Sequence, residues 1–194
     1  ATPVFLPVSM VVRSVGKREM MDTPEAKKAM DIEFNKLANQ RVRLIETVRE
    51  KDDIIAEARR TGKKVHFGDI FGICGEKGSE LPRGSKDRKF KGRFVFRGND
   101  VKDEFYQKAI FDELSSSPAT LEASKSVDAY GSIPGHKISQ CDAEQAYVQS
   151  KLGGIETWVR LPKDRWPPSW HKFKNPVCKL RLALYGHPDA GGYW

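Results

Sequence analysis

Apolar side chains recur at steps of three and four between residues 24 and 39, which is typical of a helix that packs on one face. The apolar positions are Ala26, Met30, Phe34 and Leu37. Thr23 is a favourable N-cap, and Pro24 is favourable as the first helical residue. The pattern therefore predicts a helix from Pro24 to about Asn39.

The period changes to two between residues 65 and 97. Residues 65–76 are rich in β-forming side chains, and residues 77–87 are rich in Gly, Pro and Ser. Residues 90–97 then alternate, with Phe90, Gly92, Phe94 and Phe96 on one side and Lys91, Arg93, Val95 and Arg97 on the other. We predict a β-hairpin over 65–97 with one aromatic face and one largely basic face.

Weaker patterns predict the remaining elements. Further helices are expected over 52–60, 105–114 and 118–130, and another is expected to begin near Pro188. Further strands are expected over 136–142, 158–161 and 177–184, and a loop over 165–175. Residues 41–48 fit a short strand or a turn of helix equally well. Residues 1–22 lack a usable period and are expected to form a loosely ordered lead, with one short strand at 10–12.

Composition places the chain among globular proteins of one or two domains. Of its 194 residues, 39% are apolar and 31% are charged. It has no run of 18 apolar residues and no pattern of a signal peptide, so we expect an intracellular location without a membrane partner. Its three cysteines lack metal-ligand spacing, which favours a reducing compartment.

Positive charge is concentrated in the first half of the chain. Residues 1–100 hold 22 Lys and Arg against 15 Asp and Glu, within a net charge of +8 for the whole chain. Between Arg83 and Arg97 there are seven basic residues and one acidic residue, Asp87. Such an excess suits a polyanion, through neutralisation of phosphates. A solvated charged hairpin explains the same composition.

Residues 136–152 carry the candidate chemistry. Asp142 follows the predicted strand 136–142, and Ala146 and Tyr147 come next along the chain. A carboxylate at the end of a strand is well placed to hold a hard cation such as Mg²⁺. Asp also commonly caps a turn after a strand, so this stretch by itself leaves both interpretations open.

A set of short motifs in a fixed order extends this stretch in both directions. The motifs are Lys91-x-Arg93-x-Val95 ending at Gly98, Asp142-x-x-x-Ala146-Tyr147, Val159-x-Leu161-Pro162, Val177-Cys178-Lys179-Leu180 and Leu184-Tyr185-Gly186. In this order and spacing the chain resembles the reverse transcriptase of copia-type retrotransposons from about Ala26 to Trp194.

The resemblance implies a fold and a set of domains. It implies an α+β fold, with an antiparallel sheet, helices packed on one face, and incomplete fingers and palm. Residues 23–135 would form a fingers-like region with the basic hairpin 65–97, and residues 136–194 would form part of the palm. The Ser117-Pro118 pair matches the start of a helix in the family.

The resemblance also implies site residues. Asp142 would be a catalytic carboxylate and, with the carbonyl of Ala143, a ligand of Mg²⁺ in a site of two ions. Lys91 and Arg93 would contact the triphosphate, and Tyr147 would exclude a 2′-OH. The residues expected to contact nucleic acid are Arg88, Lys89 and Arg97. Partners would be an RNA or DNA template-primer, a dNTP and the rest of the Pol polyprotein (remaining palm, thumb and RNase H), in the cytoplasm or in virus-like particles.

Two departures from the family qualify these expectations. No Asp-Asp pair follows Asp142, so the second acidic motif is missing and a fragment that is inactive as an isolated chain is expected. Asp189 stands where the family usually has Gln, and an acid beside a triphosphate is repulsive. The alternative is a non-catalytic nucleic-acid-binding remnant that uses the basic hairpin. Glu144 and Asp128 are interpreted as structural, and the four histidines receive no role.

Overall fold

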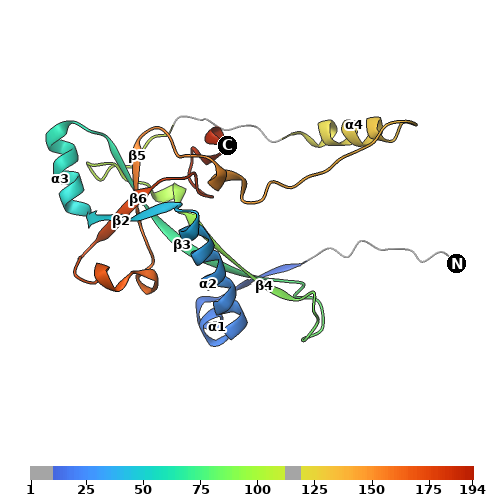
Figure 1. Ribbon diagram of the computed structural model, residues 1–194, viewed down its shortest axis with the longest axis horizontal. Coiled ribbons are helices and arrows are strands. Elements are labelled where there is room, and N and C mark those ends of the chain that lie inside the picture. Colours follow the sequence, from blue (N-terminus) through green and yellow to red (C-terminus); the bar gives the residue numbers. More distant parts are fainter. Residues whose placement is uncertain (1–10, 112–118) are drawn as a thin grey trace.

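The computed structural model describes residues 11–111 and 119–194 as a six-stranded, mostly antiparallel sheet with helices against it (Figure 1). The strand order is β1-β3-β5-β6-β2, and β4 pairs with β3 outside this path. The mixed α and β content and the mostly antiparallel sheet agree with the expected fold class.

The longest strand, β3 (Val65–Lys77), organises the sheet. β4 (Lys89–Phe96) pairs with it antiparallel and confirms the predicted hairpin. The other edge of β3 pairs with two strands in succession. β5 (Glu156–Arg160) pairs with residues 65–69, and β1 (Val12–Val15) pairs with residues 74–77. The β3–β5 pairing is parallel, which is the one exception to the antiparallel arrangement of the described strands.

Two further strands complete the sheet beyond β5. β6 (Pro176–Leu180) pairs antiparallel with β5, and β2 (Arg43–Glu50) pairs antiparallel with β6. Residues 41–48, for which strand and helix were both open, therefore lie mainly in a strand. The strand predicted over 177–184 ends at Leu180, and beyond it Leu182 forms only an isolated bridge with Lys151.

The two main helices confirm their predictions but pack on opposite faces of the sheet. α2 (Pro24–Asn39) packs through Ala26, Met30 and Leu37 on the face that carries Phe94 and Phe96. α3 (Lys51–Thr61) packs through Ile54, Ile55 and Ala58 on a separate cluster of Val65, Phe67, Trp158 and Val177. The expectation of helices on one face was wrong, because adjacent residues such as Trp158 and Val159 are both buried, one in each cluster.

Local sequence was a poor guide in three places. Of the helix expected over 105–114, residues 112–114 lie outside the described residues, and residues 105–111 are not helical: a turn at 103–107 is closed by a bridge between Lys102 and Lys108. Asp103 Oδ1 accepts from the Phe105 and Gln107 N–H groups and competes with a helix. The strand expected over 136–142 is exposed chain without strand pairing. Part of the expected loose lead is ordered, as β1 and as α1 (Lys17–Asp22).

The remaining helices are short or exposed. α4 (Leu121–Gly131) begins after the N-cap Thr120, whose Oγ1 accepts from the Ala123 N–H, and has no buried residue. The Ser117-Pro118 start predicted for it lies outside the described residues. α5 (Ala190–Tyr193) follows the C-terminal turn. The 3₁₀ turns are η1 (Gly98–Asp100), η2 (Ala146–Gln149), η3 (Lys163–Arg165) and η4 (Pro168–Trp170).

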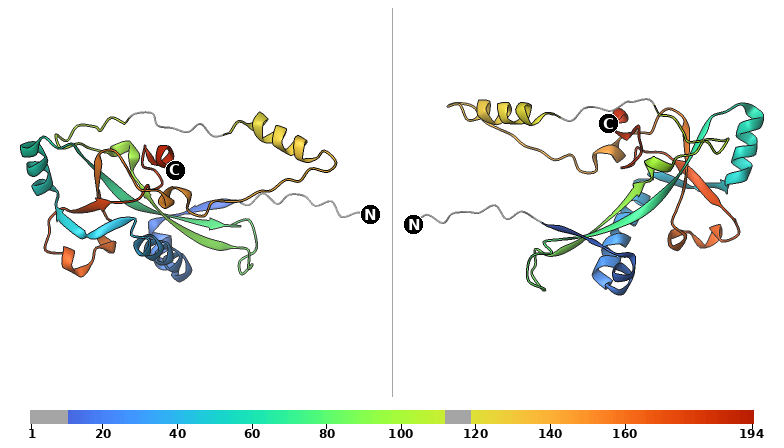
Figure 2. Two further views of the ribbon diagram at one scale, coloured as in Figure 1. Left: turned by 45° about the horizontal axis from the view of Figure 1, so that its top comes forward. Right: turned by 180° about the vertical axis from the view of Figure 1, so that it is seen from behind.

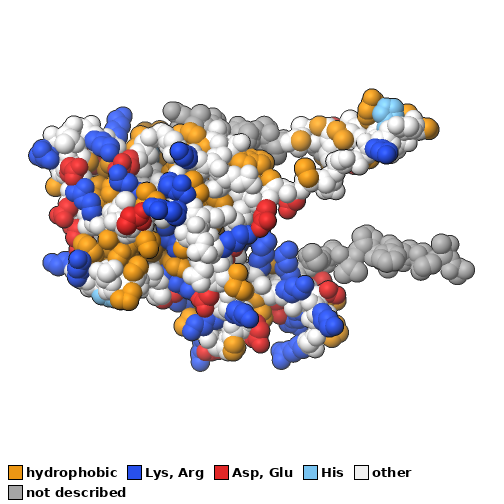
Figure 3. Space-filling model, viewed as in Figure 1, with side chains coloured by type: hydrophobic (Ala, Val, Ile, Leu, Met, Phe, Trp, Pro, Cys, Tyr) orange, Lys and Arg blue, Asp and Glu red, His pale blue; other side chains and the backbone are white. Residues whose placement is uncertain are grey.

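Two projections extend from the sheet, as Figure 2 shows from two further directions. One is the outer part of the β3–β4 hairpin, and the other is α4 with the chain that follows it. A wide notch separates them, with Lys and Arg side chains gathered on the hairpin side (Figure 3). Within residues 11–111 and 119–194, no helix combines the length and apolar character needed to cross a membrane.

Candidate nucleic-acid and nucleotide interface

The outward face of β4 carries the predicted basic row. Lys91, Arg93 and Arg97 are exposed, whereas Phe94 and Phe96 on the other face are buried. Within the described residues these three cations have no ion pair, and Arg97 instead lies over the ring of Phe71 at 5.2 Å. Their charges are therefore accessible to an anionic ligand.

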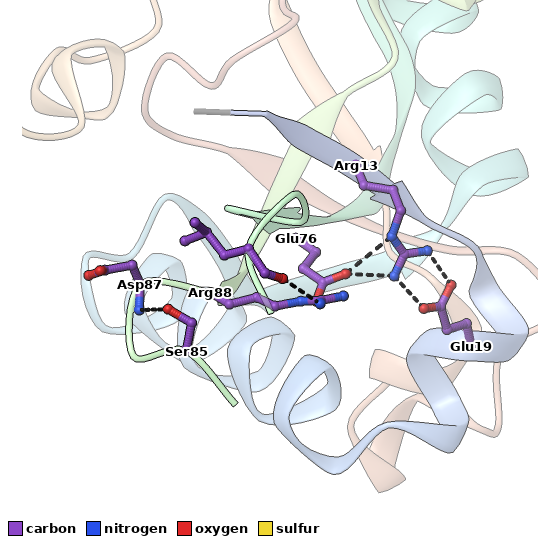
Figure 4. A network of polar contacts seen from close by, with 7 residues as sticks. Arg13, Glu19, Glu76, Ser85, Asp87 and Arg88 are labelled. Atoms are coloured by element: carbon purple, nitrogen blue, oxygen red, sulfur yellow. Dashed lines mark hydrogen bonds and ion pairs between the residues drawn. The ribbon is translucent and has the colours of Figure 1, made fainter. Parts of the chain in front are cut away.

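Arg88 lies at the start of the same hairpin strand but in a different setting. Its Nε donates to the buried carboxylate of Glu76, and its Nη1 donates to the carbonyl of Leu81 at 3.1 Å (Figure 4). Glu76 also accepts two hydrogen bonds from Arg13. The charge of Arg88 is thus engaged inside the protein, while its neighbour Lys89 is exposed.

The Leu184-Tyr185-Gly186 motif lies directly on the end of β4. The Phe96 N–H donates to the Tyr185 carbonyl at 2.8 Å. Gly186 has a φ of 87°, and a Cβ at Gly98 would lie 2.2 Å from the Gly186 carbonyl oxygen. Both motif glycines are required by this close backbone contact, because a larger residue at Gly98 would collide with main chain rather than with a flexible side chain.

Residues of two other sequence motifs act on the side chain of Tyr185, one by ring contact and the others through their charge. Its ring lies 4.8 Å from that of Tyr147, edge to face. Burial raises the pKa of Tyr185; the positive charge of Arg93 opposes this rise, and the nearby Tyr147 and Asp142 add to it. Arg93, Asp142 and Tyr147 therefore all lie within electrostatic reach of one side chain, although about fifty residues separate Arg93 from the other two.

Asp142 itself lies on exposed chain and not at the end of a strand. The segment that follows is held to α2, because Lys36 forms an ion pair with Glu144, and Gln40 Nε2 donates to Gln145 Oε1 at 2.7 Å. Glu144 is exposed, as expected. These two exposed contacts place the segment after Asp142 beside the C-terminal end of α2.

The donor set around Asp142 does not fit two Mg²⁺ ions. Ala143 is exposed and adds one carbonyl oxygen, whereas the carboxylate of Glu144 is paired with Lys36. In the described part of the chain, no group of three or more His, Cys, Asp and Glu side chains is arranged to hold a metal ion. A site of two ions needs carboxylates beyond those gathered here.

Sequence reasoning missed a buried pair of histidines behind this surface. His187 packs on Phe96 with ring centroids 4.8 Å apart, and both His66 and His187 contact the ring of Phe111. Burial and, to a smaller extent, the nearby charge of His66 together lower the pKa of His187 to about 4. Because these histidines are far apart in the sequence, no local pattern could have predicted their contact.

Asp189, the residue that stands where the family usually has Gln, lies beside the buried pair His66 and His187. Its N–H donates to His187 Nδ1 at 3.2 Å, its Oδ1 is buried, and its charge raises the pKa of His66 against the effect of burial. The acid is therefore oriented toward the protein interior. The repulsion expected between Asp189 and a triphosphate does not follow from this geometry.

Neither a scan of protein-family models nor searches of curated proteins and of solved structures returned a match to this chain. The functional argument accordingly depends on the ordered motifs and on how the fold arranges them.

Proposed function

We propose that this chain is part of an RNA-directed DNA polymerase of the copia-type retrotransposon class. It would supply the fingers and the first part of the palm, and it would bind a template-primer and a deoxynucleotide. One observation carries the proposal: Tyr185 of the Leu184-Tyr185-Gly186 motif is in ring contact with Tyr147 and lies within electrostatic reach of Arg93 and Asp142. Nothing in the local sequence requires these residues to lie within reach of one side chain.

Each gathered residue has a role that its chemistry suits. Lys91 and Arg93 offer unpaired positive charge to the phosphates of a nucleotide, where charge on leaving pyrophosphate must be offset. Tyr147, held edge to face against Tyr185, presents a large ring that leaves no room for a ribose 2′-OH. Arg97, further along the same face, would contact the nucleic-acid strand. Asp142 would supply one carboxylate, and the chain by itself is expected to lack polymerase activity.

A second candidate function is a non-catalytic nucleic-acid-binding remnant. It is favoured by the absence, among the described residues, of a carboxylate group able to hold two metal ions. It shares the basic face of the hairpin with the first proposal but assigns no role to Asp142 or Tyr147. The two proposals therefore differ in whether Asp142 and Tyr147 contact a bound nucleotide.

Salt-dependent binding tests what the two proposals share. The chain should bind a labelled primer-template in fluorescence anisotropy, with a slope of log K against log salt of about −3 if Lys91, Arg93 and Arg97 each neutralise one phosphate. Replacing Lys91 and Arg93 by Ala should make the slope about 2 units less negative. The matched control replaces Lys27 and Lys28, exposed residues of α2, and should leave the slope unchanged. A salt-independent affinity would contradict both proposals.

Sugar selection separates the polymerase from the remnant. In a longer enzyme that contains this chain together with a second carboxylate motif, Tyr147→Ala should admit ribonucleotides while Tyr147→Phe should not. The reason is that selection depends on the bulk of the ring and not on its hydroxyl. Primer extension with each nucleotide type measures this. Equal discrimination by the Ala variant would remove Tyr147 from the site and favour the remnant.

A further inference from the structure

A groove opens on the sheet where β3 changes its partner. β3 pairs with β5 as far as Asp69 and Arg160, and it pairs with β1 only from Cys74 onward, along the same edge. Residues 70–73 have no strand beside them on that edge. An open groove of about 530 Å³ occupies this position. Ile70 and Phe71 of this stretch line the groove, together with the end of β5 and residues of the segment 161–175.

The lining of the groove is strongly cationic. Four cations (Arg97, Arg160, Lys163 and Lys174) face a single carboxylate, that of Asp69. Arg160 engages this carboxylate through two hydrogen bonds of 2.9 Å. Arg97, Lys163 and Lys174 are exposed, and none of them forms an ion pair with another residue of the described chain. Positive charge therefore remains in excess throughout the groove.

Two aromatic rings lie among these cations. Phe71 is half-buried on β3 with the Arg97 guanidinium over its ring, and Trp166 is half-buried and fixed by its Nε1, which donates to the Leu161 carbonyl at 2.9 Å. Both rings line the groove. Fixed aromatic rings beside unpaired cations are the combination that binds single-stranded nucleic acid, through stacking of bases and neutralisation of phosphates.

The groove continues on both sides. A second hollow of about 180 Å³ shares Asp69, Arg160 and Asn175 with it and adds Lys51, Lys102 and Asp100, of which the last two form an ion pair. On the other side, Arg97 directly follows β4, and its N–H donates to the Asp69 carbonyl at 2.8 Å, which continues the pairing that places Lys91 and Arg93 on the outward face. The basic face of the hairpin and the groove thus form one path across the sheet, with Arg97 at the junction.

We propose that this groove binds an unpaired strand of nucleic acid, with Arg97, Lys163 and Lys174 on its phosphates and Phe71 and Trp166 against its bases. A duplex is a poorer occupant because its base faces are stacked on each other and unavailable to the rings. The proposal rests on the nucleic-acid binding proposed above and adds to it a second contact area, centred on the loop 161–175, for which the sequence patterns predicted no function.

The test compares two labelled primer-templates that share one duplex, one blunt and one with an unpaired 5′ extension of about ten nucleotides, within the usual site size of such grooves. The wild-type chain should prefer the extended substrate. Lys163→Glu with Lys174→Glu should weaken binding of the extended substrate by about tenfold to a hundredfold and remove the preference. Because both lysines are exposed and unpaired, this variant should fold, which circular dichroism can check.

The matched control applies the same charge change on α2, through Lys27→Glu with Lys28→Glu, and should retain the preference for the extension. An equal loss in both variants would mean that only net charge matters, and would overturn the groove. Phe71→Leu keeps an apolar side chain but should still reduce the preference severalfold; an unchanged preference would contradict stacking on this ring.

Failure of the groove and failure of the proposed function give different results. A wild-type chain that binds both substrates equally would refute the groove while leaving the hairpin contact intact. A wild-type chain that binds neither substrate would refute the proposed function itself.

Discussion

Glu76 shows how a single buried carboxylate fixes the base of the basic hairpin. Its side chain is 4% exposed and accepts hydrogen bonds from Arg88, just before β4, and from Arg13 on β1, while Arg13 also contacts Glu19 (Figure 4). The hydrogen bond from Arg88, followed by those from Arg13, lowers the pKa of Glu76 to about 2. The contacts connect β1, β3 and β4 at the end of the sheet where the hairpin projects.

Replacing Glu76 by Gln should destabilise the protein by about 1 to 3 kcal/mol, because it leaves the bonded donors of Arg13 and Arg88 without their charged acceptor. The native carboxylate has a lowered pKa, so its stabilisation is complete above about pH 4.5 and is lost as pH falls toward 2. The variant should lack this acid-dependent loss. Urea unfolding between these pH values measures both effects.

The control for this prediction is Glu144→Gln, which breaks an ion pair whose carboxylate side chain is 81% exposed. Exposed pairs contribute little, so its unfolding curve should stay close to that of the native chain at every pH. Equal destabilisation by the two substitutions would contradict the importance of burial at Glu76.

At the scale of elements, the contact between β4 and the Leu184-Tyr185-Gly186 motif decides where the candidate site forms. A main-chain hydrogen bond from Phe96 to Tyr185 and the approach of Gly98 to Gly186 hold the motif at the end of β4, with Tyr185 within electrostatic reach of Arg93. The hairpin alone provides cations, and this contact brings the Asp142 to Tyr147 segment to them.

Gly98→Ala should disrupt this contact, because the new Cβ would lie 2.2 Å from the Gly186 carbonyl oxygen. We expect a loss of about 1 to 3 kcal/mol in the free energy of unfolding. Gly16→Ala is the control, since a Cβ there meets no atom within 4 Å. Thermal unfolding of both variants measures the difference, and a native melting curve for Gly98→Ala would show that the contact is not tightly packed.

At the scale of the whole molecule, the C-terminal segment is joined to the sheet through buried histidines. His66 on β3 and His187 are both buried, and His187 lies 3.5 Å from Thr157 of β5, measured from Nε2 to Oγ1. Burial lowers the pKa of both histidines. Each must therefore be neutral in the folded protein near neutral pH, and each becomes charged more readily once the chain unfolds.

This arrangement predicts acid sensitivity in a window different from that of Glu76. The pKa of His187 is about 4 in the fold and about 6.5 when exposed, so its stabilisation is complete above pH 6.5 and is lost as pH falls toward 4. The loss should amount to about 2 to 3 kcal/mol. His187→Gln should flatten the pH dependence of stability in this window, whereas His171→Gln, at an exposed position, should not. An unchanged slope in the first variant would exclude His187 as the cause.

Local sequence was sufficient to predict an element where the periodicity of its own residues separates a buried face from an exposed one. The helix at Pro24 and the hairpin with its two unlike faces follow from periodicity, because each has one face to bury and one to expose. The same reasoning failed for residues 136–142, where alternation is present but no partner strand is available, and a strand without a partner leaves its backbone unpaired.

The sequence by itself determined the cationic face of β4 and the residue types of the candidate site, because side-chain alternation and chemistry are properties of the local chain. Only the tertiary structure decided that Tyr185 contacts Tyr147 within electrostatic reach of Arg93 and Asp142, that Arg88 is engaged by Glu76, and that a basic groove lies beside the edge of β3 between β5 and β1. These features depend on which strands pair and at what register, and that choice is made by packing among residues far apart in the chain.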